Sequence, residues 1–102
     1  MQNANYFKDT SFKEKVHFYM VKAAIAVMAE AATVDFHEKR VDLAIRILRG
    51  SFSIEAYALG VMTNTTVKGH IDAGTSYDND LEFVVNSLFT AYAGGANIAV
   101  EE

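Results

Sequence analysis

Three histidines are the side chains in this sequence best suited to metal binding or to acid–base chemistry. His17, His37 and His70 are far apart in the chain, and none has a second ligand at metal-binding spacing. His37 begins the run HEKRV, which lacks the second histidine four residues later that a helical HExxH zinc site requires. We therefore predict no metal, cofactor or catalytic role for the histidines, and we expect His37 to lie exposed in a first helical turn.

The run Asp78, Asp80 and Glu82 alternates acidic residues as a calcium-binding loop does. It lacks the glycine and the bidentate glutamate at the twelfth position that such a loop needs. Because the helix dipole stabilises acidic side chains near a helix start, we expect these residues to open a helix without an ion.

Signatures of nucleophilic catalysis and of phosphate binding are also absent from the sequence. The serines of GSFS do not stand in a GxSxG elbow. Gly94 and Gly95 follow an expected helix instead of preceding one, so they do not form a phosphate-binding loop. Since no acid, base and nucleophile come together, we predict that the protein is not an enzyme.

Basic residues of the segment 36–49 are the candidates for contact with phosphates. Lys39, Arg46 and Arg49 fall roughly on one polar face of an expected helix, interrupted by Asp42. The net charge of −4 argues against a general nucleic-acid coat, and the following segment SFSIEAYALGVM has almost no base-reading side chains. We therefore expect any contact with DNA to be non-specific.

The spacing of apolar residues predicts an all-α fold, a compact bundle of about four helices. We expect these helices at about 11–33, 36–49, 54–63 and 80–93. Residues 64–78 mix β-branched residues with Gly69 and Gly74, which predicts a loop or a short helical turn.

Capping residues give the expected helix ends. A capping box of Ser11 and Glu14 predicts the first helix start, and one of Asn79 and Glu82 predicts the last. Asp35 is the expected N-cap of the second helix, and Ser51 or Ser53 that of the third. Gly50 is expected just after the second helix, in a left-handed conformation. The inward residues expected in the second helix are Val41, Ala44, Ile45 and Leu48.

The first helix carries more apolar residues than one core-facing stripe requires. Later helices of about 10–14 residues can cover only part of such a helix. We predict that the uncovered side is an oligomer or partner interface, together with apolar residues of the C-terminal tail. The residues of this predicted interface are Phe18, Val21, Ile25, Ala29, Ile98 and Val100.

A chain of 102 residues fits one domain, which we place at 11–95, between a flexible arm at 1–10 and a flexible tail at 96–102. Residues 1–49 hold eight lysines and arginines against six acids, a charge of +2. Residues 50–102 hold one lysine against seven acids, a charge of −6. Such polarity would suit copies stacked positive end on negative end. The sequence has no signal-peptide core and no run long enough to span a membrane, so we expect a soluble protein made in the cytoplasm.

Four segments within about residues 10–95 carry a resemblance to a known group of proteins. They are KVHFYMVKAAIAVMAE, HEKRVDLAIRILRG, VMTN and YDNDLEFVVNSLFTAYAG. The last segment fits the pattern D-x-D-[LI]-x-F-x-V-N-S through Asp78, Asp80, Leu81, Phe83, Val85, Asn86 and Ser87. Together they resemble small structural proteins of tailed bacteriophages.

The resemblance implies a virion component, such as a head-tail connector, a neck protein or another head-completion protein. Such a protein would act in many copies, as in a ring, and would contact the portal or other virion proteins. It would be found in the virion and, during assembly, in the host cytoplasm. The alternative is a small cytoplasmic helical partner or regulatory protein that dimerises through the first helix.

Overall fold

A computed structural model of the chain describes residues 10–33 and 37–94, and every regular element in these ranges is helical. Five helices follow one another in the described residues. They are α1 (Thr10–Ala31), α2 (Glu38–Leu48), α3 (Ile54–Met62), α4 (Thr65–Ala73) and α5 (Asp78–Ala93). The all-α prediction is confirmed, and the predicted number of helices is corrected from four to five. The expected arm at 1–10 lies outside the described residues apart from Thr10, which begins α1, and the expected tail at 96–102 lies outside them altogether.

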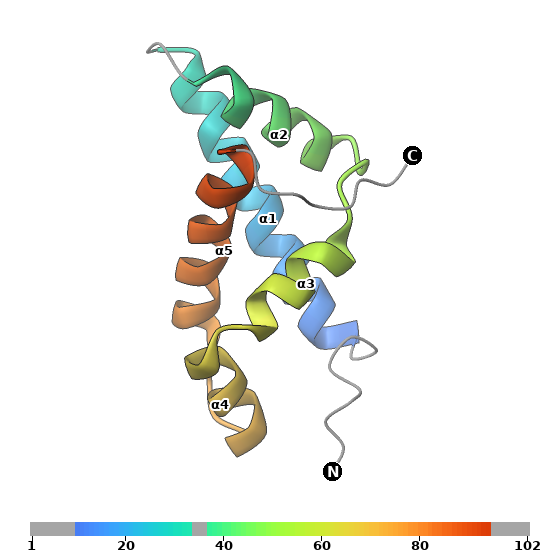
Figure 1. Cartoon of the computed structure of the whole chain (residues 1–102), viewed down its shortest axis with the longest axis vertical. Helices are drawn as coiled ribbons and strands as arrows, with labels where there is room; N and C mark the ends of the chain where they lie inside the picture. The colour runs from blue at the N-terminus through green and yellow to red at the C-terminus, as the bar shows by residue number, and fades with distance from the viewer. Residues whose placement is uncertain (1–9, 34–36, 95–102) are drawn as a thin grey trace.

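The long helix α1 passes behind the other helices along the length of the molecule (Figure 1). Its most extensive contacts are with α2, which folds back along it, and with α5, which runs beside it in nearly the same direction. α3 packs on α1 and α5 from the other side, and α4 extends the molecule at the end farthest from α2 (Figure 1). The molecule is elongated, with dimensions of 46 × 28 × 20 Å.

One apolar core joins all five helices. Its largest fully buried side chains come from all five helices and are Tyr57, Phe12, Phe89, Met20, Leu43, Leu81, Val16, Val61, Val67 and Val85. Three aromatic rings meet inside it, because Tyr57 makes edge contacts with Phe52 and Tyr92 at centroid distances of 5.3 and 5.1 Å. Burying such rings is a large part of what stabilises a small core.

Gly60 lets α3 approach α5 closely. A Cβ atom built on Gly60 would lie 2.6 Å from the Oη of Tyr92 and 3.0 Å from a methyl carbon of Leu88. Only glycine therefore fits at this crossing without displacing its neighbours.

The segment 64–78, predicted as a loop or a short helical turn, contains the nine-residue helix α4. The side chain of Asn64 accepts a hydrogen bond from the amide of Val67 at 3.0 Å, which caps the start of α4. Gly74 ends it in a left-handed conformation with φ of 75°. Capping at both ends compensates for the weak helix propensity of its threonines and Gly69.

The helix α2 is rotated from its predicted orientation. Leu43, Ala44 and Ile47 are buried, whereas the predicted inward residue Leu48 is 46% exposed. Val41 and Ile45 are half-buried. Because α1 and α5 both pack on this helix, its buried stripe faces the angle between them.

Helix starts differ from the predicted ones, except in α3. Glu38 begins α2, and the ring Nδ1 of His37 accepts a hydrogen bond from the Lys39 amide at 3.2 Å. The predicted cap Asp35 lies outside the described residues. α5 begins at Asp78 after Tyr77 without a side-chain cap, so the predicted capping box of Asn79 and Glu82 is wrong. Ser53 caps α3 and Gly50 has φ of 74°, both as predicted.

Candidate interaction surface

The helix α1 has a buried face and an exposed apolar face on opposite sides. Val16 and Met20 are 0% and 2% exposed, whereas Phe18 and Ile25 are 61% and 56% exposed. Successive helical residues are rotated by about 100°, so residues two apart point in nearly opposite directions. Phe18 and Ile25 therefore point away from the core of their own chain.

The predicted interface residues of α1 lie together on this exposed side. Val21 is half-buried and Ala29 is exposed. Ile98 and Val100, the other two predicted residues, lie outside the described residues. Whether the exposed side of α1 binds another chain stays a prediction.

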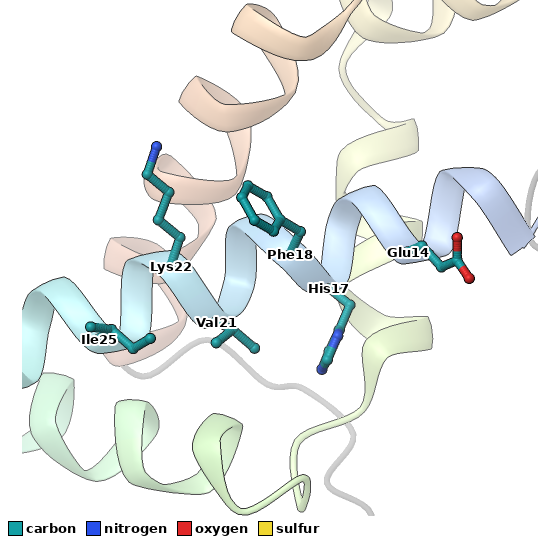
Figure 2. A pocket seen from close by; sticks show the side chains of 6 residues that line it. All are labelled: Glu14, His17, Phe18, Val21, Lys22 and Ile25. Atoms are coloured by element: carbon teal, nitrogen blue, oxygen red, sulfur yellow. The ribbon is translucent and has the colours of Figure 1, made fainter.

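A shallow apolar groove runs along this side of α1, and we call it the α1 groove. Its lining residues are Glu14, His17, Phe18, Val21, Lys22 and Ile25. Phe18 and Lys22 point towards α5, whereas His17 and Val21 point to the other side of the helix (Figure 2). The lining thus forms two ridges of residues four apart, Glu14-Phe18-Lys22 and His17-Val21-Ile25. A groove between such ridges is the surface on which a second helix packs.

Opposite charges mark the two ends of the first ridge. Lys22 donates a hydrogen bond to Glu82 of α5 at 2.8 Å, and this bond raises the pKa of the Lys22 ammonium. Glu14 has no ion-pair partner among the described residues, although its neighbours Lys13 and Lys15 bind Glu55 and Asp78 at 2.9 and 3.1 Å. The ridge therefore presents one carboxylate and one ammonium on either side of the Phe18 ring.

The predicted phosphate-contacting residues lie at a distance along the chain from the α1 groove, with Lys39 and Arg46 on α2 and Arg49 at its C-cap. Lys39 and Arg49 are exposed, and Arg46 is half-buried. The Nε of Arg46 lies 3.6 Å from the Asp42 carboxylate, one helical turn away. Asp42 therefore offsets part of the positive charge on this face, as the sequence predicted.

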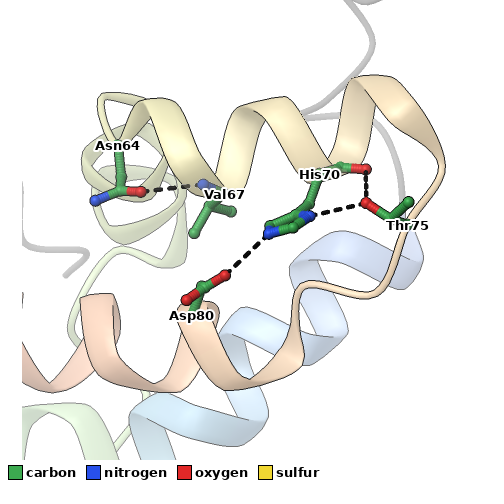
Figure 3. Close-up of polar contacts among 5 residues, drawn as sticks. All are labelled: Asn64, Val67, His70, Thr75 and Asp80. Carbon is green, nitrogen blue, oxygen red and sulfur yellow. Dashed lines mark hydrogen bonds and ion pairs between the residues drawn. The ribbon is translucent and has the colours of Figure 1, made fainter.

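A contact that the sequence did not predict joins His70, Thr75 and Asp80 (Figure 3). The ring Nδ1 of His70 lies 2.8 Å from the Thr75 hydroxyl, and its Nε2 lies 3.1 Å from a carboxylate oxygen of Asp80. The order of groups resembles a hydrolase triad. The Thr75 hydroxyl, however, is also 3.3 Å from the His70 carbonyl, and the Thr75 amide donates to that carbonyl at 2.9 Å. These bonds close the end of α4 and tie it to α5, so capping accounts for the contact.

Other exposed apolar side chains lie on separate helices. Phe83 on α5 is 71% exposed, Leu59 on α3 is 59% exposed and Leu48 on α2 is 46% exposed. Single exposed apolar residues are common on protein surfaces. The α1 groove differs because several apolar side chains line one continuous depression.

Within residues 10–33 and 37–94, no group of three or more histidine, cysteine or acidic side chains is placed to hold a metal ion. None of the helices in those ranges is both long and apolar enough to cross a membrane.

Comparisons with protein-family models, with characterised proteins and with solved structures give no match to this chain. The resemblance to bacteriophage structural proteins therefore stays a prediction from the sequence.

Proposed function

We propose that this protein is a non-enzymatic structural subunit that works by binding further copies of itself through the exposed side of α1. The observation that carries the proposal is the α1 groove, with Phe18 and Ile25 more than half exposed on the side of α1 opposite the core. Burying one such side chain gains roughly 1.5–3 kcal/mol, and a second copy would bury two on each chain.

The resemblance of the sequence to small structural proteins of tailed bacteriophages supports the proposal that this subunit acts in the virion of such a phage. The subunit would be a head-tail connector, neck or head-completion protein, bound to the portal or to other virion proteins. An elongated molecule with apolar surface on its longest helix suits a protein that works only inside an assembly.

A ring would need a second contact, different from the first, because ring interfaces join unlike surfaces. The two ends of the molecule offer such a pair. α2 carries three basic residues against two acidic ones, Arg49 follows as its C-cap, and the helix lies at the opposite end from α4 (Figure 1). The acids in α4 and at the start of α5 are Asp72, Asp78, Asp80 and Glu82, and each of them also contacts a basic side chain or histidine of its own chain.

The alternative function is a small cytoplasmic partner or regulatory protein that dimerises. The α1 groove supports this function equally, because a dimer requires only one interface and the groove can supply it. The two functions differ in where the protein is found, since a virion component remains bound to purified particles after washing in high salt.

The test has two parts, self-association and location. Light scattering after size-exclusion chromatography measures the mass of the wild type and of Ile25→Asp. We expect the wild type to form oligomers and the variant to be a folded monomer, because a buried aspartate without a partner costs several kcal/mol. A monomeric wild type at high concentration would refute self-association. An antibody against the protein, applied to purified particles, then distinguishes the virion setting from the cytoplasmic alternative.

A further inference from the structure

We propose that two copies of the chain pair through their α1 grooves in antiparallel orientation, with the two Phe18 rings meeting at a two-fold axis. This inference rests on the proposed self-association and adds to it the direction and the register of the pair. Three features of the described residues lead to it: the ridges of α1, the order of charges along one ridge, and the ion pairs that the neighbouring lysines already form within the chain.

The first feature is the shape of the α1 groove. Helices pack most often with the ridge of residues four apart on one helix lying in the groove of the other, at a crossing angle of about −50°. The ridge Glu14-Phe18-Lys22 borders such a groove on α1. The same ridge of a second copy fits the groove, because Phe18 supplies a large apolar side chain at the middle of the ridge.

The second feature is the order of charges along that ridge. Glu14 lies four residues before Phe18, and Lys22 lies four residues after it. In an antiparallel pair centred on Phe18, Glu14 of each copy lies beside Lys22 of the other. The dimer therefore contains two Glu14–Lys22 ion pairs, related by the two-fold axis. A parallel pair in the same register would bring glutamate beside glutamate and lysine beside lysine, which is unfavourable.

The third feature is that the lysines of α1 on either side of Glu14 already form ion pairs within the chain. Lys13 and Lys15 bind Glu55 and Asp78, while Glu14 has no such partner in the described part of the chain. Lys22 keeps its bond to Glu82, and an ammonium has three donors, so it can bind a second carboxylate at the same time. A second copy therefore matches both the shape and the charges of the groove.

Cysteine cross-linking tests the direction and the register. The chain has no native cysteine, so each single-cysteine variant reports on one position. A disulfide requires Cα atoms within about 7 Å of each other. Phe18→Cys lies at the axis and should form a disulfide dimer on mild oxidation. Ile25→Cys lies seven residues from the axis on each copy, which separates the two sulfurs by roughly 20 Å, so it should stay uncross-linked.

Charge reversal tests the ion pairs. We expect Glu14→Lys and Lys22→Glu each to weaken the dimer by about tenfold or more, because each creates two like-charge contacts. The double variant Glu14→Lys/Lys22→Glu restores opposite charges and should return most of the affinity. The double variant and Lys22→Glu both lack the bond to Glu82, so comparing them isolates the contact between copies. Glu30→Lys, which makes the same charge change on α1 outside the groove, is the control and should leave the affinity unchanged.

The outcomes separate this inference from the proposed function. Rescue in the double variant, together with cross-linking of Phe18→Cys alone, supports the antiparallel pair. If Ile25→Asp dissociates the oligomer but the double variant is no tighter than Lys22→Glu, or if Ile25→Cys cross-links as well as Phe18→Cys, the register is wrong while self-association stands. If neither Ile25→Asp nor the charge reversals change the mass, both proposals fail.

Discussion

Phe18 and Met20 are two residues apart on α1, yet 61% of Phe18 is exposed and only 2% of Met20. The pair shows that one helix serves two surfaces, the core of its own chain and the α1 groove. Because the two surfaces are separate, substitutions can change folding and association independently.

Met20→Ala should lower the free energy of unfolding by about 2–5 kcal/mol, because it removes a buried side chain from a packed core. Phe18→Ala should change that free energy by no more than about 0.5 kcal/mol, since the lost atoms are mostly exposed. Urea denaturation of dilute protein measures both values. Equal losses in the two variants would mean that Phe18 belongs to the core.

Gly60→Ala and Gly69→Ala should have opposite effects on stability. A Cβ at Gly60 would lie 2.6 Å from the Tyr92 hydroxyl, whose ring is held against Tyr57 and Phe52, so the crossing must open. We expect a loss of about 1–3 kcal/mol. A Cβ at Gly69 meets no atom within 4 Å, so alanine should stabilise α4 by up to about 1 kcal/mol. Thermal denaturation compares them, and a stabilising Gly60→Ala would contradict the close approach of α3 and α5.

Tyr57→Phe should not destabilise the protein below pH 9. The Tyr57 hydroxyl is buried and has no hydrogen-bond partner in the described part of the chain, so removing it relieves an unpaired polar group. We expect a change between zero and about 2 kcal/mol in favour of folding. Tyr92→Phe is the matched comparison, because it loses the hydrogen bond to the Ala56 carbonyl at 3.3 Å and should be destabilising.

The same residue should make the protein sensitive to alkali. Burial raises the pKa of the Tyr57 phenol above its ordinary value of 10.0, so the folded state keeps the proton after the unfolded chain has lost it. The stability is therefore fully present below pH 10.0 and falls as the pH rises above that value. Denaturation between pH 9 and pH 11 should show a shallower fall for Tyr57→Phe, and identical slopes would refute the assignment.

Asn64→Ala should loosen α4 by removing its N-cap, at a cost of about 0.5–2 kcal/mol. Because α4 packs mainly on α3 and α5, its amides should exchange faster while those of α1 are protected as before. Asn64→Asp retains an oxygen acceptor and should keep the wild-type exchange rates. Unchanged exchange in Asn64→Ala would show that the tertiary contacts of α4 suffice to hold it.

The sequence predicted the helices whose apolar residues recur over several turns. In α5, the apolar residues Leu81, Val84, Val85 and Phe89 recur at helical spacing, and all four are buried. In α3, Tyr57, Ala58 and Val61 follow the helical spacing and are buried. When apolar residues recur in this way on one side of a helix, only one orientation of the helix buries all of them.

The orientation of α2 could not be predicted in the same way. Its apolar residues Val41, Leu43, Ala44, Ile45, Ile47 and Leu48 surround much of the helix, so periodicity allows more than one buried stripe. The choice of Leu43 and Ile47 depends on where α1 and α5 lie. The contact of His70 with Asp80 depends similarly on the packing of α4 against α5, which cannot be predicted from the residues of either helix alone.

The exposed side of α1 could be predicted from the sequence, because the apolar residues Phe18, Val21, Ile25 and Ala29 lie outside the stripe of α1 that faces the core. What a single sequence could not reveal is that Glu14 has no ion-pair partner within residues 10–33 and 37–94, since this depends on how the chain folds and on which charges Lys13 and Lys15 bind.

In the proposed function, the exposed side of α1 joins copies of this chain. Light scattering of the wild type and Ile25→Asp over a wide range of concentrations tests it most directly. We expect the wild-type mass to rise to at least that of a dimer, while Ile25→Asp stays at the 11.2 kDa of one chain with an unchanged helical circular dichroism spectrum. A wild type that remains at 11.2 kDa at the highest concentration, or an Ile25→Asp variant that associates like the wild type, would contradict the claim.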